Sequence, residues 1–234
     1  TVIAVFAATS ETDTPFQAGI EAYQNAQYKT AKTQFTAALE LNETAAARHN
    51  LGLTQLQLDA PAAAVWQLER AQLLEPFNVD YRYKLEAVRQ ELGLFAGSPK
   101  WTILASQTLS TKTWIIIATI SFWVLLAALI LPRISGTKIS ISLKALRLMS
   151  IGALILSIPS IWLNLRLLQS GTIITDEAAS LHAAPASAAP ESGTARPGER
   201  ARILDQYNHF YEIKTEGLAS GWVSKDAFRP IVTD

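Results

Sequence analysis

Residues 114–131 read W-I-I-I-A-T-I-S-F-W-V-L-L-A-A-L-I-L, a run of 18 residues without a charge. Residues 148–165 read L-M-S-I-G-A-L-I-L-S-I-P-S-I-W-L-N-L and are also uncharged. As a helix, each run is about 27 Å long, close to the hydrocarbon core of a bilayer at about 30 Å. The sequence therefore predicts a hairpin of two transmembrane helices. A buried core hairpin of a soluble protein is the alternative, but uncharged runs of this length disfavour it.

The segment between the two runs, residues 132–147, carries four basic residues and no acidic one. Short loops rich in lysine and arginine stay on the cytoplasmic side of a membrane. The loop is therefore predicted to be cytoplasmic, and both ends of the chain are predicted to lie outside the cytoplasm. Trp114 and Trp162 lie near the opposite, non-cytoplasmic ends of the two runs, where interfacial aromatic residues are common.

Residues 1–10, T-V-I-A-V-F-A-A-T-S, have the composition of the end of a signal peptide. Val5-Phe6-Ala7 would serve as its small-residue cleavage site. We expect a signal-peptide remnant here, and an exported N-terminal domain agrees with the cytoplasmic loop. A short strand or a plain tail is the alternative.

Composition excludes several classes of function. Residues 12–93 hold ten acidic and seven basic residues, and residues 171–234 hold nine and six, so neither part has the basic surface that nucleic acid requires. The chain has no cysteine, which excludes disulfides, zinc–thiolate sites, iron–sulfur clusters and cysteine nucleophiles. It also lacks the H-E-x-x-H, G-x-S-x-G, phosphate-loop and dinucleotide-binding motifs. We therefore expect no cofactor, no metal and no enzymatic activity.

The N-terminal third repeats itself with an offset of 33 residues, which indicates stacked helix pairs. The offset aligns small or apolar residues, namely Gly19 with Gly52, Ala31 with Ala64, Phe35 with Leu68, Ala38 with Ala71 and Leu41 with Leu74. The pattern A-G-x-x-A-Y, followed by Q-Y-x-x-A-x-x-x-F-x-x-A-L-E-L, resembles the tetratricopeptide repeat. The resemblance implies an all-α repeat solenoid over residues 11–93, ending in a capping helix.

Tetratricopeptide repeats bind partners in a concave groove. The resemblance implies that this groove is lined by Phe16, Ile20, Tyr23, His49, Leu53, Tyr83 and Gln90. Its aromatic and apolar character suits a peptide or helix as the ligand. For Ile20 and Leu53, a place in the core is the equal alternative.

The segments before and after the two uncharged runs differ in composition. Residues 94–113 are expected to form either a linker or a short helix at the membrane interface. Residues 183–198 are rich in Ala, Pro, Ser and Gly, which predicts a mobile loop. The segment G-W-V-S-K-D-A-F-R-P-I at 221–231 resembles the end of bacterial SH3-like domains.

This second resemblance implies a small all-β SH3-like barrel over residues 172–232. Its candidate ligand surface is aromatic and consists of Tyr207, Phe210, Tyr211 and Trp222. For Trp222, a core position is the favoured alternative.

The order of these parts, repeats, two-helix hairpin and SH3-like tail, resembles the BatE-type proteins of the Bacteroides aerotolerance operons. The resemblance implies a two-pass protein of the bacterial inner membrane with both termini in the periplasm. It also implies a role as an interaction scaffold beside von Willebrand-type membrane proteins and a MoxR-type ATPase. The expected partners are the lipid bilayer and other membrane proteins, and no nucleic acid. The alternative function is a module that binds peptidoglycan through the SH3-like domain.

Overall fold

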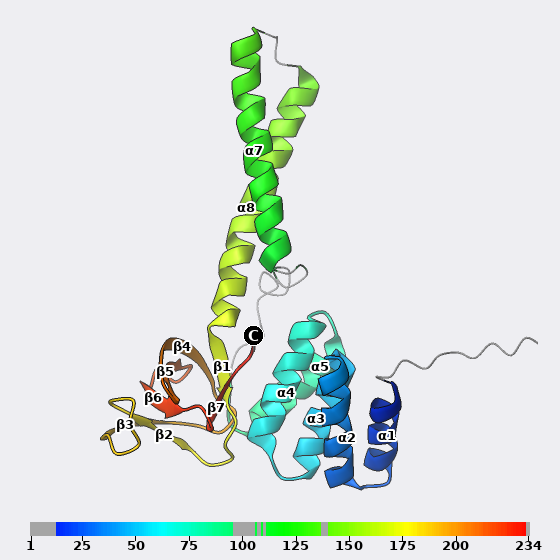
Figure 1. Cartoon of the computed structure of the whole chain (residues 1–234), viewed down its shortest axis with the longest axis vertical. Helices are drawn as coiled ribbons and strands as arrows, with labels where there is room; N and C mark the ends of the chain where they lie inside the picture. Colours follow the sequence, from blue (N-terminus) through cyan, green and yellow to red (C-terminus); the bar gives the residue numbers. More distant parts are fainter. Residues whose placement is uncertain (1–12, 96–105, 107–108, 110, 137–139, 233–234) are drawn as a thin grey trace, which may run out of the picture. The chain divides into compact units, whose positions relative to one another are not determined.

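The computed structural model describes residues 13–95, 106, 109, 111–136 and 140–232, which form two compact units (Figure 1). The first unit combines residues 13–95 with residues 169–232, and the second holds the described residues from 106 to 168. The predicted signal-peptide remnant and most of the predicted linker lie outside the described residues.

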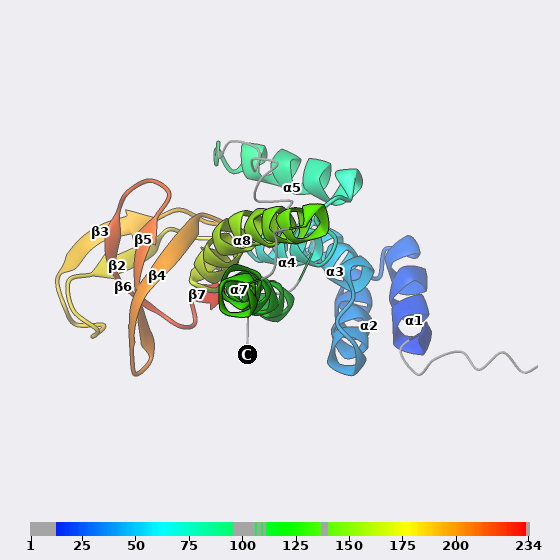
Figure 2. The same cartoon turned by 90° about the horizontal axis from the view of Figure 1, so that it is seen from above.

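Five antiparallel helices form the N-terminal part of the first unit, and each packs against the next (Figure 2). They are α1 (Asp13–Gln24), α2 (Tyr28–Leu41), α3 (Ala45–Gln57), α4 (Pro61–Leu74) and α5 (Val79–Glu91). Side chains at the boundaries explain where some of them begin. The Thr44 hydroxyl accepts a hydrogen bond from the Ala47 amide at 3.2 Å, and Asn78 caps α5 in the same manner. Pro61, which needs no amide partner, opens α4.

The 33-residue offset corresponds to the same contact in two helix pairs. A Cβ atom added to Gly19 would lie 2.7 Å from the ring of Phe35, where α1 crosses α2. A Cβ atom added to Gly52 would lie 3.0 Å from Leu68, where α3 crosses α4. Phe35 and Leu68 are both fully buried. The repeated glycines therefore allow the close approach of a large apolar side chain from the next helix.

An antiparallel sheet of seven strands completes the first unit. The strands are β1 (Ser170–Ile173), β2 (Ala179–His182), β3 (Glu191–Ala195), β4 (Arg200–Tyr207), β5 (Phe210–Thr215), β6 (Ser220–Ser224) and β7 (Phe228–Pro230). Their order in the sheet is β3-β2-β6-β5-β4-β1-β7. The core on this sheet consists mainly of Ile173, Leu181, Ile213, Val223 and Phe228, each of which is less than 2% exposed.

The sheet is open, and the expectation of a closed SH3-like barrel over residues 172–232 is wrong in this respect. Within the described residues, β3 and β7 are its two edges and do not pair with each other. β7 has only three residues, and it ends at Pro230, which has no amide hydrogen to donate to a further strand. The predicted mobile loop at 183–198 is also partly wrong, because β3 lies inside it and pairs with β2.

The second unit contains two long helices, α7 (Thr111–Ser135) and α8 (Ile141–Leu168). By length and composition, both are apolar and long enough to cross a membrane. Each is longer than the uncharged run that predicted it, and the helices continue through Pro132 and Pro159. Membrane helices tolerate proline because neighbouring groups can satisfy the freed carbonyl.

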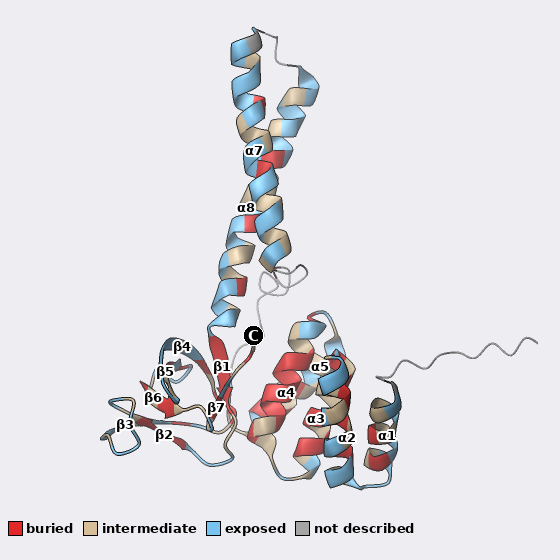
Figure 3. Cartoon of the chain, viewed as in Figure 1, coloured by how far each residue is buried: buried red, intermediate tan, exposed pale blue. Residues whose placement is uncertain are grey.

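Burial in this helix pair is opposite to that of a soluble protein (Figure 3). The buried residues of α7 and α8 are small or polar, namely Ser121, Ala128, Ser150, Ser157 and Asn164. Large side chains such as Trp123, Leu148 and Ile155 are 61–73% exposed. Small residues at the contact let two helices approach closely, as membrane helix pairs do. Arg147, near the connecting segment, donates two hydrogen bonds to the carbonyl of Ala128 at 2.7 and 3.1 Å.

Candidate functional site

The predicted helical groove begins with three residues of α1 that the structure places against a core. Phe16, Ile20 and Tyr23 are half-buried and pack on the cluster around Phe35. The rings of Phe16 and Phe35 are 5.8 Å apart. Much of this apolar surface therefore holds α1 on α2, which leaves less of it for a ligand.

The remaining groove residues lie on α3 and α5. The ring of His49 stacks on Tyr81 with 4.6 Å between centroids, and its Nδ1 has no hydrogen-bond partner among the described residues. Burial and, to a smaller extent, the charge of Lys84 lower the pKa of His49 below its ordinary value, which favours the neutral ring. The other three residues differ in exposure, with Leu53 half-buried, Gln90 exposed and Tyr83 72% exposed.

The predicted aromatic surface of the sheet is only partly exposed. Tyr207 is 57% exposed, whereas Phe210, Tyr211 and Trp222 are half-buried. The ring of Tyr211 lies 5.6 Å from that of Phe228 and packs against the sheet core. Tyr207 is therefore the most available of the four for a ligand, whereas the other three side chains are partly covered by neighbouring residues of the sheet.

Helix α4 joins the helices to the sheet, and its residues are buried without interruption from Ala64 to Ala71. An amphipathic helix with one solvent-exposed face would expose about half of these positions. Here α3 and α5 cover part of its surface, and β1 contacts it as well. The helices and the sheet therefore form one body around α4.

Glu69 is the centre of this junction, with a side chain that is only 1% exposed. Its carboxylate accepts hydrogen bonds from Arg89 at 2.8 Å, from Arg200 at 2.8 and 3.1 Å, and from the hydroxyl of Thr172. Arg89 also donates to Glu216 at 2.6 Å. A buried carboxylate is tolerated only when cations and hydrogen bonds surround it in this way. The charge of Glu69 raises the pKa of Arg200 above its ordinary value.

A second ionic cluster joins α4, through Arg70, to α3 and the residue Glu43 before it. Arg70 and Arg48 both pair with Glu43, and Arg70 also donates to the carbonyl of Ile231 at 2.6 Å. Burial acts to raise the pKa of Glu43, but hydrogen bonds and charges from Arg70 and Arg48 outweigh it, so this pKa lies below its ordinary value. The indole of Trp66 lies between two guanidinium groups, those of Arg48 and Arg229, each 4.9 Å from its ring centroid.

Backbone groups complete the junction. Trp66 donates its indole hydrogen to the carbonyl of Pro230 at 2.9 Å. The first turn of α4 has no cap from Ala60, and the carboxylate of Asp176 accepts a hydrogen bond from the Ala62 amide at 3.2 Å instead. A residue 114 positions later in the chain thus supplies the missing N-terminal partner of α4.

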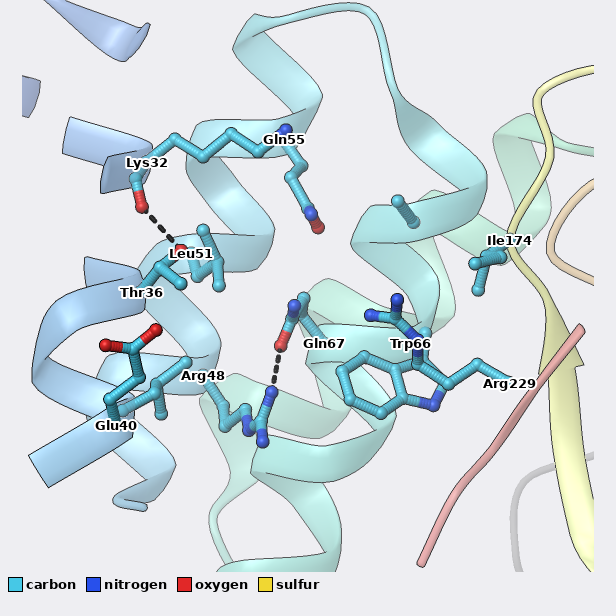
Figure 4. Close-up of a pocket in the computed structure, with 12 residues that line it drawn as sticks. Lys32, Thr36, Glu40, Arg48, Leu51, Gln55, Trp66, Gln67, Ile174 and Arg229 are labelled. Carbon is cyan, nitrogen blue, oxygen red and sulfur yellow. Dashed lines mark hydrogen bonds between the residues drawn. The ribbon is translucent and has the colours of Figure 1, made fainter. Parts of the chain in front are cut away.

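Beside this junction is a cavity of about 510 Å³, shown in Figure 4. It is lined by residues of α2, α3 and α4 together with one residue before β2 and one of β7, namely Lys32, Thr36, Leu39, Glu40, Arg48, Leu51, Gln55, Ala63, Trp66, Gln67, Ile174 and Arg229. None of the residues predicted for the groove lines it. The volume is in the range of small-molecule and peptide sites.

The sequence interpretation missed both the junction and this cavity. A usable signal was present in α4, because residues 61–74 contain only two charged residues, Glu69 and Arg70, which are adjacent and so leave no polar stripe. A helix without a polar face is usually buried on all sides. That pattern could have predicted a second covering layer, although it could not have identified the sheet.

Within the part of the chain that the structure describes, no group of three or more His or acidic residues is placed to hold a metal ion. In comparisons with protein-family models, curated proteins and solved structures, none matches this chain.

Proposed function

We propose that this protein is a membrane-anchored scaffold of the bacterial cell envelope that binds other proteins outside the cytoplasm and catalyses no reaction. In this proposal, α7 and α8 cross the inner membrane, α1 to α5 are tetratricopeptide-type repeats, and the sheet is an open relative of SH3-like domains. Its partners are other membrane proteins, of the von Willebrand and MoxR-associated kind that the resemblance to BatE-type proteins implies.

One observation carries the proposal: the first unit is built from chain on both sides of the hairpin. Glu69, which is buried, and Arg200 form an ion pair at 2.8 Å although 131 positions separate them. Because both segments belong to one folded body, the outer ends of α7 and α8 must be on the same side of any membrane they cross. This supports a two-pass topology independently of the charge of the connecting loop.

The repeat identity is supported by contacts. Gly19 with Phe35 and Gly52 with Leu68 make the same close crossing one repeat apart. Stacked helix pairs of this kind leave an extended surface suited to peptides and helices. Tyr83 and Gln90 are the most exposed of the residues predicted for that surface.

Co-purification tests the scaffold function. The tagged chain is extracted from membranes of its own host in a mild detergent, and the proteins that accompany it are quantified by mass spectrometry. We expect specific membrane proteins to accompany the chain, and to be depleted when Tyr83 and Gln90 are both changed to alanine. The matched control is Tyr207→Ala, which removes an exposed aromatic residue from the sheet. A chain that migrates alone as a monomer would contradict the scaffold function.

Cysteine labelling tests the topology, since the natural chain contains no cysteine. A single cysteine at Ser140, in the connecting segment, is expected to react with an impermeant maleimide only after the cells are lysed. A single cysteine at Thr30, an exposed residue of α2, is expected to react once the outer membrane is permeabilised. Reversal of these two results would show the opposite orientation.

A further inference from the structure

The cavity beside α4 has the chemistry of a ligand site that is separate from the predicted groove. Three cations, Lys32, Arg48 and Arg229, line it, against one acid, Glu40. Arg48 is already paired with Glu43 at 2.7 Å. Among the described residues, neither Lys32 nor Arg229 forms an ion pair. Two cations therefore remain for a negatively charged ligand.

The arginines in and beside the cavity are close enough to influence one another. Burial lowers the pKa of Arg48, and the charges of Arg70 and Arg229 lower it further, although Glu43 opposes them. Lys32, Arg48 and Arg229, which line the cavity with Glu40 as its one acid, give it a positive potential, although Glu43 beside Arg48 offsets part of it. An anion placed in this cavity would be attracted by that potential.

The first requirement of a ligand is a negative charge, and Gln55 adds a second, a hydrogen-bond donor. Its side chain is 8% exposed and lines the cavity, and its Oε1 has no hydrogen-bond partner within the described part of the chain. Buried polar atoms are nearly always hydrogen-bonded, so such an atom needs a partner. Figure 4 shows Gln55 pointing from α3 into the same space as Gln67 and Trp66. A ligand that donates an N–H to this oxygen would satisfy it.

Trp66 supplies a rigid apolar wall. Its indole is fixed by the hydrogen bond to Pro230 and by the two guanidinium groups of Arg48 and Arg229. The wall therefore exists before any ligand binds, which lowers the entropic cost of binding. Because Arg229 belongs to β7, the cavity is complete only when the sheet is packed on the helices.

We propose that this cavity binds an acidic peptide segment of a partner protein, with its carboxylate side chains toward Lys32 and Arg229 and a backbone N–H on Gln55. A peptide meets both requirements, because it carries N–H donors beside its acidic side chains. A simple anion without a hydrogen-bond donor, such as sulfate, would meet only the first. The inference rests on the scaffold proposal because it names a partner protein, but it is tested separately, since binding is measured on the purified chain without a membrane partner.

The experiment measures the fluorescence anisotropy of a rhodamine-labelled, capped peptide in which glutamate alternates with alanine. The titrant is the full chain in detergent, and the control peptide has glutamine in place of glutamate. We expect the glutamate peptide to bind more tightly. Lys32→Gln, Arg229→Gln and Gln55→Leu should each weaken binding about threefold to tenfold.

Two matched variants serve as controls, Lys29→Gln on the same helix and Arg202→Gln on β4, because both side chains are exposed and outside the cavity. These controls should bind the peptide like the parent. Equal binding of the two peptides, absence of binding, or cavity variants that behave like the controls would overturn the proposal. Displacement by inorganic phosphate with the same dependence on Lys32 and Arg229 would show a general anion site, and the peptide assignment would then be wrong.

Discussion

Helix α4 and helix α8 are both largely apolar, yet they bury opposite kinds of residue. In α4, large and charged side chains such as Trp66 and Glu69 are buried, between 3% and 4% exposed. In α8, small polar residues such as Ser150 and Ser157 are buried, whereas Ile155 is 64% exposed. The difference shows which surroundings each helix needs. Protein on several sides covers α4, whereas the exposed face of α8 is apolar, in a helix that is long and apolar enough by composition to cross a membrane.

The largest effect is expected from breaking the buried ionic centre of α4. Glu69→Ala leaves the buried guanidinium of Arg89 without this carboxylate and also removes the partner of the partly exposed Arg200, which should cost about 3–5 kcal/mol. The measurement is guanidinium unfolding of the full chain in detergent, followed by tryptophan fluorescence. The control Glu21→Ala, at an exposed position of α1, should change the free energy of unfolding by less than about 0.5 kcal/mol. A loss as small as that of the control would show that the junction contributes little.

The corresponding test in the hairpin places a large side chain at a buried small residue of α8. Ser157 is fully buried, so Ser157→Leu should force α7 and α8 apart at a cost of about 1–3 kcal/mol. The control Ile155→Ala changes an outward side chain and should leave the pairing of the helices intact. Titration of SDS into maltoside micelles, followed by circular dichroism, measures the helix pairing. If the control is the more damaging change, Ile155 faces protein rather than lipid.

A pair of glycines compares the two regions directly. An added Cβ at Gly19 meets the buried ring of Phe35, whereas one at Gly152 of α8 has nothing within 4 Å. Gly19→Ala should therefore destabilise the first unit by about 1–2 kcal/mol, since overpacking exceeds the gain in helix propensity. Gly152→Ala should cause no loss, and thermal unfolding of both variants checks the difference. Equal behaviour would mean that α1 moves away from α2 without cost.

The smallest expected effect is a pH dependence of stability that arises from Glu43 in the first unit. The folded pKa of Glu43 lies below the unfolded value of 4.5, so the unfolded chain takes up its proton at a higher pH. Stability from this carboxylate is therefore fully present above about pH 4.5 and is lost as the pH falls through the folded pKa. Glu43→Gln should flatten this part of the stability curve measured by denaturant unfolding, whereas Glu40→Gln should keep it. An unchanged curve for Glu43→Gln would assign the acid sensitivity to other groups.

The sequence predicted the helices well, because charge-free runs and the spacing of small residues depend on neighbouring positions within one segment. The uncharged runs produced α7 and α8, although both continue beyond the runs, because a proline or a cation near an end does not stop a helix. The 33-residue offset predicted the crossings at Gly19 and Gly52. The open sheet was not predictable from G-W-V at 221–223, because edge pairing depends on the length and register of distant strands.

The candidate site was predicted less well. The groove residues were chosen by resemblance, and the structure shows that Phe16 and Ile20 also serve the core. The cavity was missed because Arg229 and Lys32 are 197 positions apart, and only the packing of the sheet on α4 brings them together. No periodicity within one segment contains that information. The sequence did show one sign of this packing, because α4 has almost no charged residues and therefore needs cover on several sides.

The hydrogen bond from the Ala62 amide to Asp176 also has a consequence for timing. During synthesis, residues 61–74 emerge long before residue 176, and two apolar helices must be made in between. Until then, α4 lacks its N-terminal partner, and Glu69 lacks Arg200. The contacts that surround α4 are therefore complete only after the last quarter of the chain has been made. A unit whose first helices precede the hairpin is thus completed only after the hairpin has been made.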